Sequence, residues 1–107
     1  MSAFDCFLKK EELVSRAYDI DEDLYSILKN ISSTRYNCSV SNLVNVAIKY
    51  LIDTEKIISY ERNKNLGKIH RSFLINKSCF DGLENLKDKY KIPICQLVNI
   101  AIYISLE

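Results

Sequence analysis

Hydrophobic residues recur along this chain with two periodicities, and each pattern occurs twice. Residues 17–21 alternate, with Tyr18 and Ile20 on one face, which is typical of a half-buried strand. A stripe with helical spacing follows, formed by Leu24, Ile27, Leu28 and Ile31. Residues 40–51 are apolar on almost every side, which indicates a central, buried helix. The pattern therefore predicts a strand followed by two helices.

The second half of the chain repeats this order. The sequence LVNVAI at residues 43–48 returns as LVNIAI at residues 97–102, and RAYDID at 16–21 returns as RSFLIN at 71–76. The second helical stripe consists of Phe80, Leu83, Leu86 and Tyr90. Because a unit this short cannot bury its own hydrophobic face, we expect the two copies to pack together as one domain.

A few polar residues recur at matching places in the two copies. Asn45 and Asn99 lie on otherwise apolar helices. A structural hydrogen bond shared by both repeats explains them best, and a ligand contact is the alternative. Ser39 or Ser41 is expected to cap the helix that follows. Pro93 takes the place of Ser39 in the second copy, where proline suits the first turn of a helix.

The repeat divides the chain into four segments. Residues 16–52 and 71–107 are the two units, and residues 53–70 are a linker into which the preceding helix can continue. Residues 1–15 form an N-terminal segment. A short amphipathic helix is expected within it, to cap the core or to dock on a partner, from the spacing of Phe4, Phe7 and Leu8.

The composition argues against several classes of function. The formal net charge of +1 favours no particular partner. The cysteines lack metal-binding spacing and His70 is the one histidine, so we expect free thiols in a reducing cytosol and no metal. No nucleophile–base pair or glycine-rich loop is visible, so neither an enzyme nor a cofactor is predicted. The cysteines are Cys6, Cys38, Cys79 and Cys95.

Membrane association is not expected either. The longest apolar stretch, residues 92–106, is interrupted by polar residues, and a bilayer span needs about 20 apolar residues. The N-terminus lacks the apolar run of a signal peptide. The sequence therefore predicts a cytoplasmic protein without a membrane partner.

A strand followed by two helices, of which the second is apolar all round, resembles the ribbon-helix-helix family of DNA-binding proteins. The resemblance covers residues 16–52 and 71–106. It implies a mainly α fold in which residues 17–21 pair with residues 72–76 as an antiparallel ribbon over a four-helix core. Family members are usually homodimers, whereas here both copies lie in one chain. The chain is thus similar to duplicated accessory proteins of plasmid conjugation and to some viral regulators.

The resemblance also implies a site on double-stranded DNA, with the ribbon in the major groove and helix N-termini on the phosphates. The residues that would contact bases are Ala17, Asp19, Asp21, Ser72, Leu74 and Asn76. The residues that would contact phosphates are Arg16, Ser39, Val40, Ser41, Arg62, Lys64, Lys68, Arg71, Ile94 and Cys95. The implied function is regulation of transcription or an accessory role in a plasmid, phage or conjugation process. Further copies are expected to bind adjacent sites, and each site is expected to be asymmetric because the two halves differ.

The charges divide between two hypotheses. Asp19 and Asp21 can accept a hydrogen bond from cytosine N4 but repel phosphates, which favours a protein-interaction module with an antitoxin-like or inhibitor-like role. Residues 62–80 carry five basic residues and no acid, which favours DNA. Arg16 and Arg71 begin the two predicted strands, so we expect them at opposite ends of the ribbon, within reach of phosphates.

Overall fold

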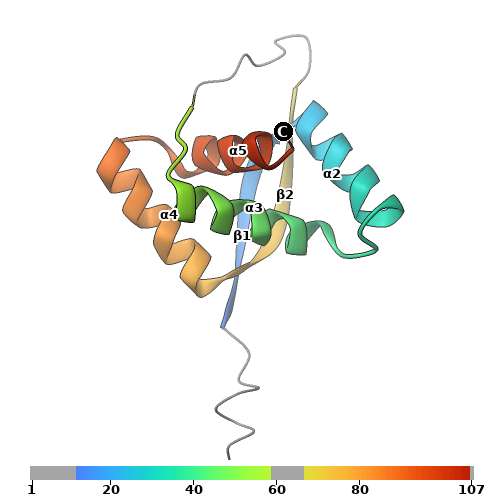
Figure 1. Cartoon of the computed structure of the whole chain (residues 1–107), viewed down its shortest axis with the longest axis horizontal. Helices are drawn as coiled ribbons and strands as arrows, with labels where there is room; N and C mark the ends of the chain where they lie inside the picture. Colours follow the sequence, from blue (N-terminus) through green and yellow to red (C-terminus); the bar gives the residue numbers. More distant parts are fainter. Residues whose placement is uncertain (1–11, 59–66, 107) are drawn as a thin grey trace, which may run out of the picture.

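The computed structural model describes residues 12–58 and 67–106, and in them a strand followed by two helices occurs twice (Figure 1). The first half contains β1 (Leu13–Asp21), α2 (Glu22–Thr34) and α3 (Val40–Thr54). The second half contains β2 (Lys68–Asn76), α4 (Lys77–Tyr90) and α5 (Ile94–Ser105). The fold is therefore mainly helical, with one two-stranded antiparallel sheet.

The two strands form an antiparallel ribbon that is centred on one residue pair. Ala17 lies opposite Ser72, and these residues occupy equivalent positions in the sequence repeat. The ribbon extends from the pair Leu13–Asn76 to the pair Asp21–Lys68. The pairing of 17–21 with 72–76 is therefore wrong in register, since residues 17–21 pair with residues 68–72. Both strands begin three residues before the predicted units. The sequence pattern did not reveal these first strand residues, because they are mostly exposed and alternate only weakly in hydropathy.

The helices lie on one face of the ribbon and bury its inward side chains. These are Tyr18, Ile20, Phe73 and Ile75, as predicted. The most deeply buried helix is α5, whose buried residues are Leu97, Val98, Asn99, Ile100, Ala101, Ile102 and Ile104. The prediction of an all-round buried helix thus describes α5.

The equivalent helix α3 buries one side only. Its buried residues are Val44, Ala47, Ile48 and Leu51. Val46 and Tyr50 are 65 % and 45 % exposed, so the expectation that α3 is surrounded by other parts of the chain is wrong. In α2, Ile27 is likewise exposed although it belongs to the predicted stripe.

The helix boundaries follow from local chemistry. The Ser39 hydroxyl accepts a hydrogen bond from the Asn42 amide at 3.1 Å and caps α3, as one of the two predicted alternatives. Pro93 stands at the N-cap of α5 without a side-chain cap. At its other end α3 stops at Thr54, because Glu55 adopts a left-handed conformation with φ of 48°. The helix therefore continues into the predicted linker through Asp53 and Thr54 and does not extend beyond them.

Tyr18 is the one buried side chain in residues 12–58 and 67–106 whose polar atom has no hydrogen-bond partner. Burial raises the pKa of its phenol above the usual value of 10.0. The equivalent residue in the second repeat is Phe73, whose ring is stacked with that of Tyr18. The hydroxyl therefore costs desolvation energy without a compensating bond.

We expect Tyr18→Phe to raise the free energy of unfolding by about 1 kcal/mol, because the substitution removes an unpaired buried hydroxyl and keeps the ring. Urea unfolding followed by circular dichroism measures this change. Phe73→Tyr is the matched control and should lower stability. A Tyr18→Phe protein that is less stable than the parent would show that the hydroxyl is bonded in solution.

Candidate nucleic-acid interface

The outward side of the ribbon is an exposed surface that both strands share. It carries the alternate residues of each strand, and we call it the ribbon face: Leu13, Ser15, Ala17, Asp19, Lys68, His70, Ser72 and Leu74. All of these residues are exposed. Four of the six predicted base-contacting residues lie on the ribbon face, namely Ala17, Asp19, Ser72 and Leu74.

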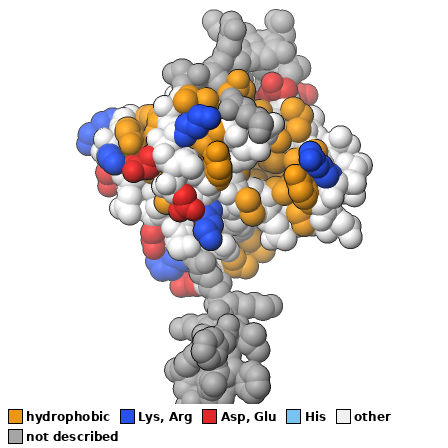
Figure 2. Space-filling model, in the orientation of Figure 1, with side chains coloured by type: hydrophobic (Ala, Val, Ile, Leu, Met, Phe, Trp, Pro, Cys, Tyr) orange, Lys and Arg blue, Asp and Glu red, His pale blue; other side chains and the backbone are white. Residues whose placement is uncertain are grey.

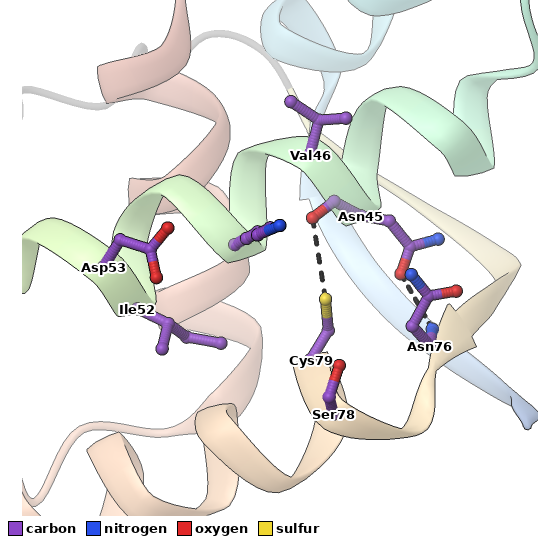
Figure 3. A pocket seen from close by; sticks show the side chains of 8 residues that line it. Asn45, Val46, Ile52, Asp53, Asn76, Ser78 and Cys79 are labelled. Carbon is purple, nitrogen blue, oxygen red and sulfur yellow. Dashed lines mark hydrogen bonds between the residues drawn. The ribbon is translucent and has the colours of Figure 1, made fainter. Parts of the chain in front are cut away.

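The two remaining predicted base contacts lie where a strand passes into a helix. Asp21 is at the N-cap position of α2 and is 3 % exposed. Its burial leaves no surface for a base, so the prediction for Asp21 is corrected. Asn76 is at the N-cap position of α4, is half-buried, and lines a hollow between α3 and α4 (Figure 3). The alternation of residues along a strand does not show where the strand ends and a helix begins, so it did not separate these two residues from the ribbon face.

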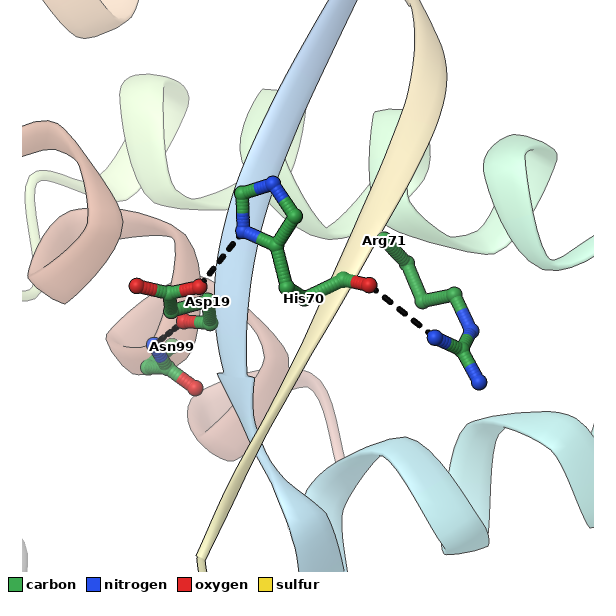
Figure 4. A network of polar contacts seen from close by, with 4 residues as sticks. All are labelled: Asp19, His70, Arg71 and Asn99. Atoms are coloured by element: carbon green, nitrogen blue, oxygen red, sulfur yellow. Dashed lines mark hydrogen bonds and ion pairs between the residues drawn. The ribbon is translucent and has the colours of Figure 1, made fainter.

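Asn45 and Asn99 fasten the second helix of each repeat to the ribbon. The Asp21 amide donates to Asn99 Oδ1 at 2.8 Å, and Asn99 Nδ2 donates to the Asp19 carbonyl at 2.9 Å (Figure 4). In the other repeat, the Asn76 amide donates to Asn45 Oδ1 at 2.8 Å, and Asn45 Nδ2 donates to the Leu74 carbonyl at 2.8 Å (Figure 3). The predicted structural hydrogen bonds are confirmed, and the two amides are occupied by the backbone rather than directed at a ligand.

These bonds place one helix N-terminus beside each strand. Asn45 lies just beyond the first turn of α3, and the Ser41 hydroxyl accepts a hydrogen bond from the Leu74 amide of β2 at 3.3 Å. Asn99 lies at the same point of α5 and holds β1. The predicted phosphate-contacting residues of the two first turns therefore flank the ribbon face on opposite sides. Of these, Ser39 is exposed, and the half-buried ones are Val40, Ser41, Ile94 and Cys95.

Arg16 and Arg71 lie next to the centre of the ribbon. Arg16 pairs with Phe73, and Arg71 pairs with Tyr18, so the expectation that these arginines occupy the ends of the ribbon is wrong. The error follows from the strand starts, which lie three residues earlier than predicted. Both side chains are exposed. Each arginine stacks on an aromatic ring of the other repeat, and the two rings occupy equivalent positions in the two repeats. Arg16 lies 4.8 Å from the Phe80 ring centroid, and Arg71 lies 5.8 Å from that of Tyr25.

The two halves of the ribbon face differ in chemistry. One half carries Lys68, Asp19 and His70. Asp19 and His70 face each other across the two strands, and Asp19 Oδ1 lies 2.7 Å from His70 Nδ1 (Figure 4). The other half carries Leu13 and Leu74, which are 51 % and 52 % exposed. Leu13, Ser15 and His70 were not predicted as ribbon-face residues, because the observed strands begin earlier than the predicted ones.

The other predicted basic contacts fall in or beside the linker. Lys68 is the first residue of β2 and lies on the ribbon face. Arg62 and Lys64 lie outside the described residues. Among the described residues, no cluster of histidine, cysteine or carboxylate groups could hold a metal ion. None of the helices in 12–58 and 67–106 has the length and hydropathy needed to cross a bilayer.

No protein-family model, curated protein or solved structure matches this chain. The geometry of the ribbon face and of the helix N-termini beside it is therefore the basis for a proposed function.

Proposed function

We propose that this chain is a tandem ribbon-helix-helix protein that binds double-stranded DNA through the ribbon face. One observation carries the proposal: an exposed two-stranded ribbon is flanked on opposite sides by the N-termini of α3 and α5, and the repeat relates the two flanks. A two-stranded ribbon fits the major groove of B-DNA. A helix N-terminus presents backbone amides and a positive dipole end, which suit a phosphate.

The ribbon face offers several kinds of base contact. Ser72 lies at the centre and can donate or accept a hydrogen bond. Asp19 can accept from cytosine N4, and Leu74 can contact a thymine methyl group. Arg16 and Arg71 lie on the helix side of the ribbon, opposite Phe73 and Tyr18, and their exposed side chains add positive charge beside it. The proposed base contacts are therefore the four predicted residues that lie on the ribbon face, Ala17, Asp19, Ser72 and Leu74.

The difference between the two halves has a consequence for the bound sequence. Lys68 and Asp19 in one half stand where the repeat places Leu13 and Leu74 in the other. A ribbon with two chemically different halves should prefer an asymmetric site over a palindrome. We propose a role in transcription or in a plasmid, phage or conjugation process, in which further copies bind adjacent sites.

Selection from a random duplex pool tests the proposal. The protein is incubated with the pool at low and at moderate salt, and the retained fragments are sequenced. We expect one enriched, non-palindromic motif whose retention falls as salt rises, because phosphate contacts release counterions. Retention of no sequence even at low salt would overturn the proposal.

Arg71→Ala should weaken binding to every duplex and reduce the slope of log K against log salt by about 1, because one phosphate contact is lost. Titration of the selected duplex at several salt concentrations measures the slope. Lys87→Ala on α4 is the control, since Lys87 is exposed on a helix away from the ribbon face. An unchanged slope in Arg71→Ala would place this arginine away from the DNA backbone.

A protein-interaction module is the second candidate function, and the exposed leucines favour it. Leu13 and Leu74 give one half of the ribbon face an apolar surface, and Asp19 gives the other half a negative charge. A protein partner would bury the leucines, whereas DNA would contact them only at thymine methyl groups. Leu74→Ser separates the two functions: it should abolish binding to a protein partner and only shift the base preference of a DNA-binding protein.

A further inference from the structure

The side of α3 that faces away from the core is an uncovered apolar surface in residues 12–58 and 67–106. We call it the α3 face and define it by Leu43, Val46 and Tyr50, of which Val46 is 65 % exposed. Val46 lies between two hollows, one of about 310 Å³ shared with α4 (Figure 3) and one of about 350 Å³ shared with α2. Figure 2 shows hydrophobic side chains on this side of the molecule, interspersed with charged and other polar ones. The hollow shared with α2 is lined mainly by apolar side chains, whereas the hollow shared with α4 also carries Asn45, Lys49 and Asp53. An apolar occupant therefore suits the hollow shared with α2 and the surface around Val46.

In the second repeat, the surface of α5 that is equivalent to the α3 face is buried. Ile100 and Ile104 of α5 stand where the repeat places Val46 and Tyr50, and they are only 2 % and 3 % exposed. The chain that leads into β2 contributes Ile57 and Ile58, which pack against the core. The stretch that leads into β1 is the repeat-equivalent of that segment, and it comprises residues 1–12.

We propose that residues 1–11 of this chain dock on the α3 face. The described chain begins at Glu12, whose carbonyl accepts a hydrogen bond from the Lys77 amide at 2.9 Å. Lys77 lies between Asn76 and Ser78, and both of these line the hollow shared with α3. The segment therefore starts beside the surface that it covers.

The length and pattern of the segment fit this surface. Eleven residues can reach about 36 Å when extended, and a helix over residues 4–8 would take up about 8 Å of chain. Phe4, Phe7 and Leu8 have the spacing that places three apolar side chains on one side of a helix. Because the segment is tethered at Glu12, its effective concentration at the α3 face favours it over a second copy of the chain.

Cysteine cross-linking tests this proposal directly. Val46→Cys is made in the full-length Cys38→Ser, Cys95→Ser chain, so that the native thiols left are Cys6 and the buried Cys79. We expect mild oxidation to form an intrachain disulfide between Cys6 and the thiol introduced at position 46, found by peptide mapping in monomeric protein. Ser26→Cys on the exposed side of α2 is the matched control. The cross-link at position 46 should form at least ten times faster than the one at position 26.

Phe7→Asp in the Val46→Cys background supplies the second readout. It should slow the cross-link between Cys6 and position 46 about tenfold while circular dichroism stays unchanged, because it removes an apolar anchor and leaves the described core intact. Equal cross-linking rates at positions 46 and 26 would overturn the proposal. So would a dominant disulfide that joins position 46 of one chain to position 46 of another, which would assign the α3 face to a second copy.

Discussion

Val98→Asp is expected to leave this protein unfolded in water at 25 °C. Val98 lies in α5 and is 0 % exposed. An unpaired carboxylate at such a position costs at least several kcal/mol, and a small domain has a total stability of only about 5–15 kcal/mol. The helix would have to leave the core, or the carboxyl group would have to bind a proton at neutral pH, at a cost in free energy that adds to the loss of the valine side chain.

Thermal melting followed by far-ultraviolet circular dichroism measures this effect. Ile27→Asp is the matched control, because Ile27 lies on α2 and is largely exposed. It should retain a cooperative melt close to that of the parent. A cooperative, native-like melt of Val98→Asp would show that α5 is not the central helix of the core.

Asn99→Leu should have the second largest effect and lower the free energy of unfolding by about 2–4 kcal/mol, because two backbone groups lose their partner inside the protein. The Asp21 amide would lose Asn99 Oδ1, and the Asp19 carbonyl would lose Asn99 Nδ2. Asn99 itself is buried, so water cannot easily replace these bonds. The junction between β1 and α2 would also lose its contact with α5.

Comparison of the two repeats makes this prediction specific. Asn45→Leu removes the equivalent bonds, but Asn45 is only half-buried and lines an open hollow. Water can compensate there, so we expect a smaller loss of about 1–2 kcal/mol. Asn85→Leu on the exposed side of α4 is the control and should change stability little. An Asn99→Leu protein as stable as the parent would show that these bonds contribute nothing net to folding.

The duplicated pattern was sufficient to predict the order of the elements. The alternation at Tyr18 and Ile20, and the polar Asn99 within an apolar helix, each identified a residue whose environment the structure bears out. These signals succeed because they depend on burial along one element and on a polar group that must be satisfied there.

Other features depend on contacts between distant parts of the chain, and the sequence did not reveal them. Val46 and Ile100 are similar residues at equivalent positions, yet one is exposed and the other is buried. Asp21 was expected on the ribbon face, but the start of α2 and the bond to Asn99 bury it. Arg16 was misplaced because the early strand residues are largely exposed and carry little periodic signal.

Selection from a random duplex pool with a ribbon-face variant tests the DNA-binding proposal most directly. Ser72→Glu places a negative charge at the centre of the ribbon face, and Ser26→Glu places the same charge on the exposed side of α2. We predict that the parent and Ser26→Glu enrich the same asymmetric motif with salt-sensitive affinity, and that Ser72→Glu enriches none while its melting temperature stays unchanged. Equal enrichment by Ser72→Glu, or no enrichment by the parent at low salt, would contradict DNA binding through the ribbon face.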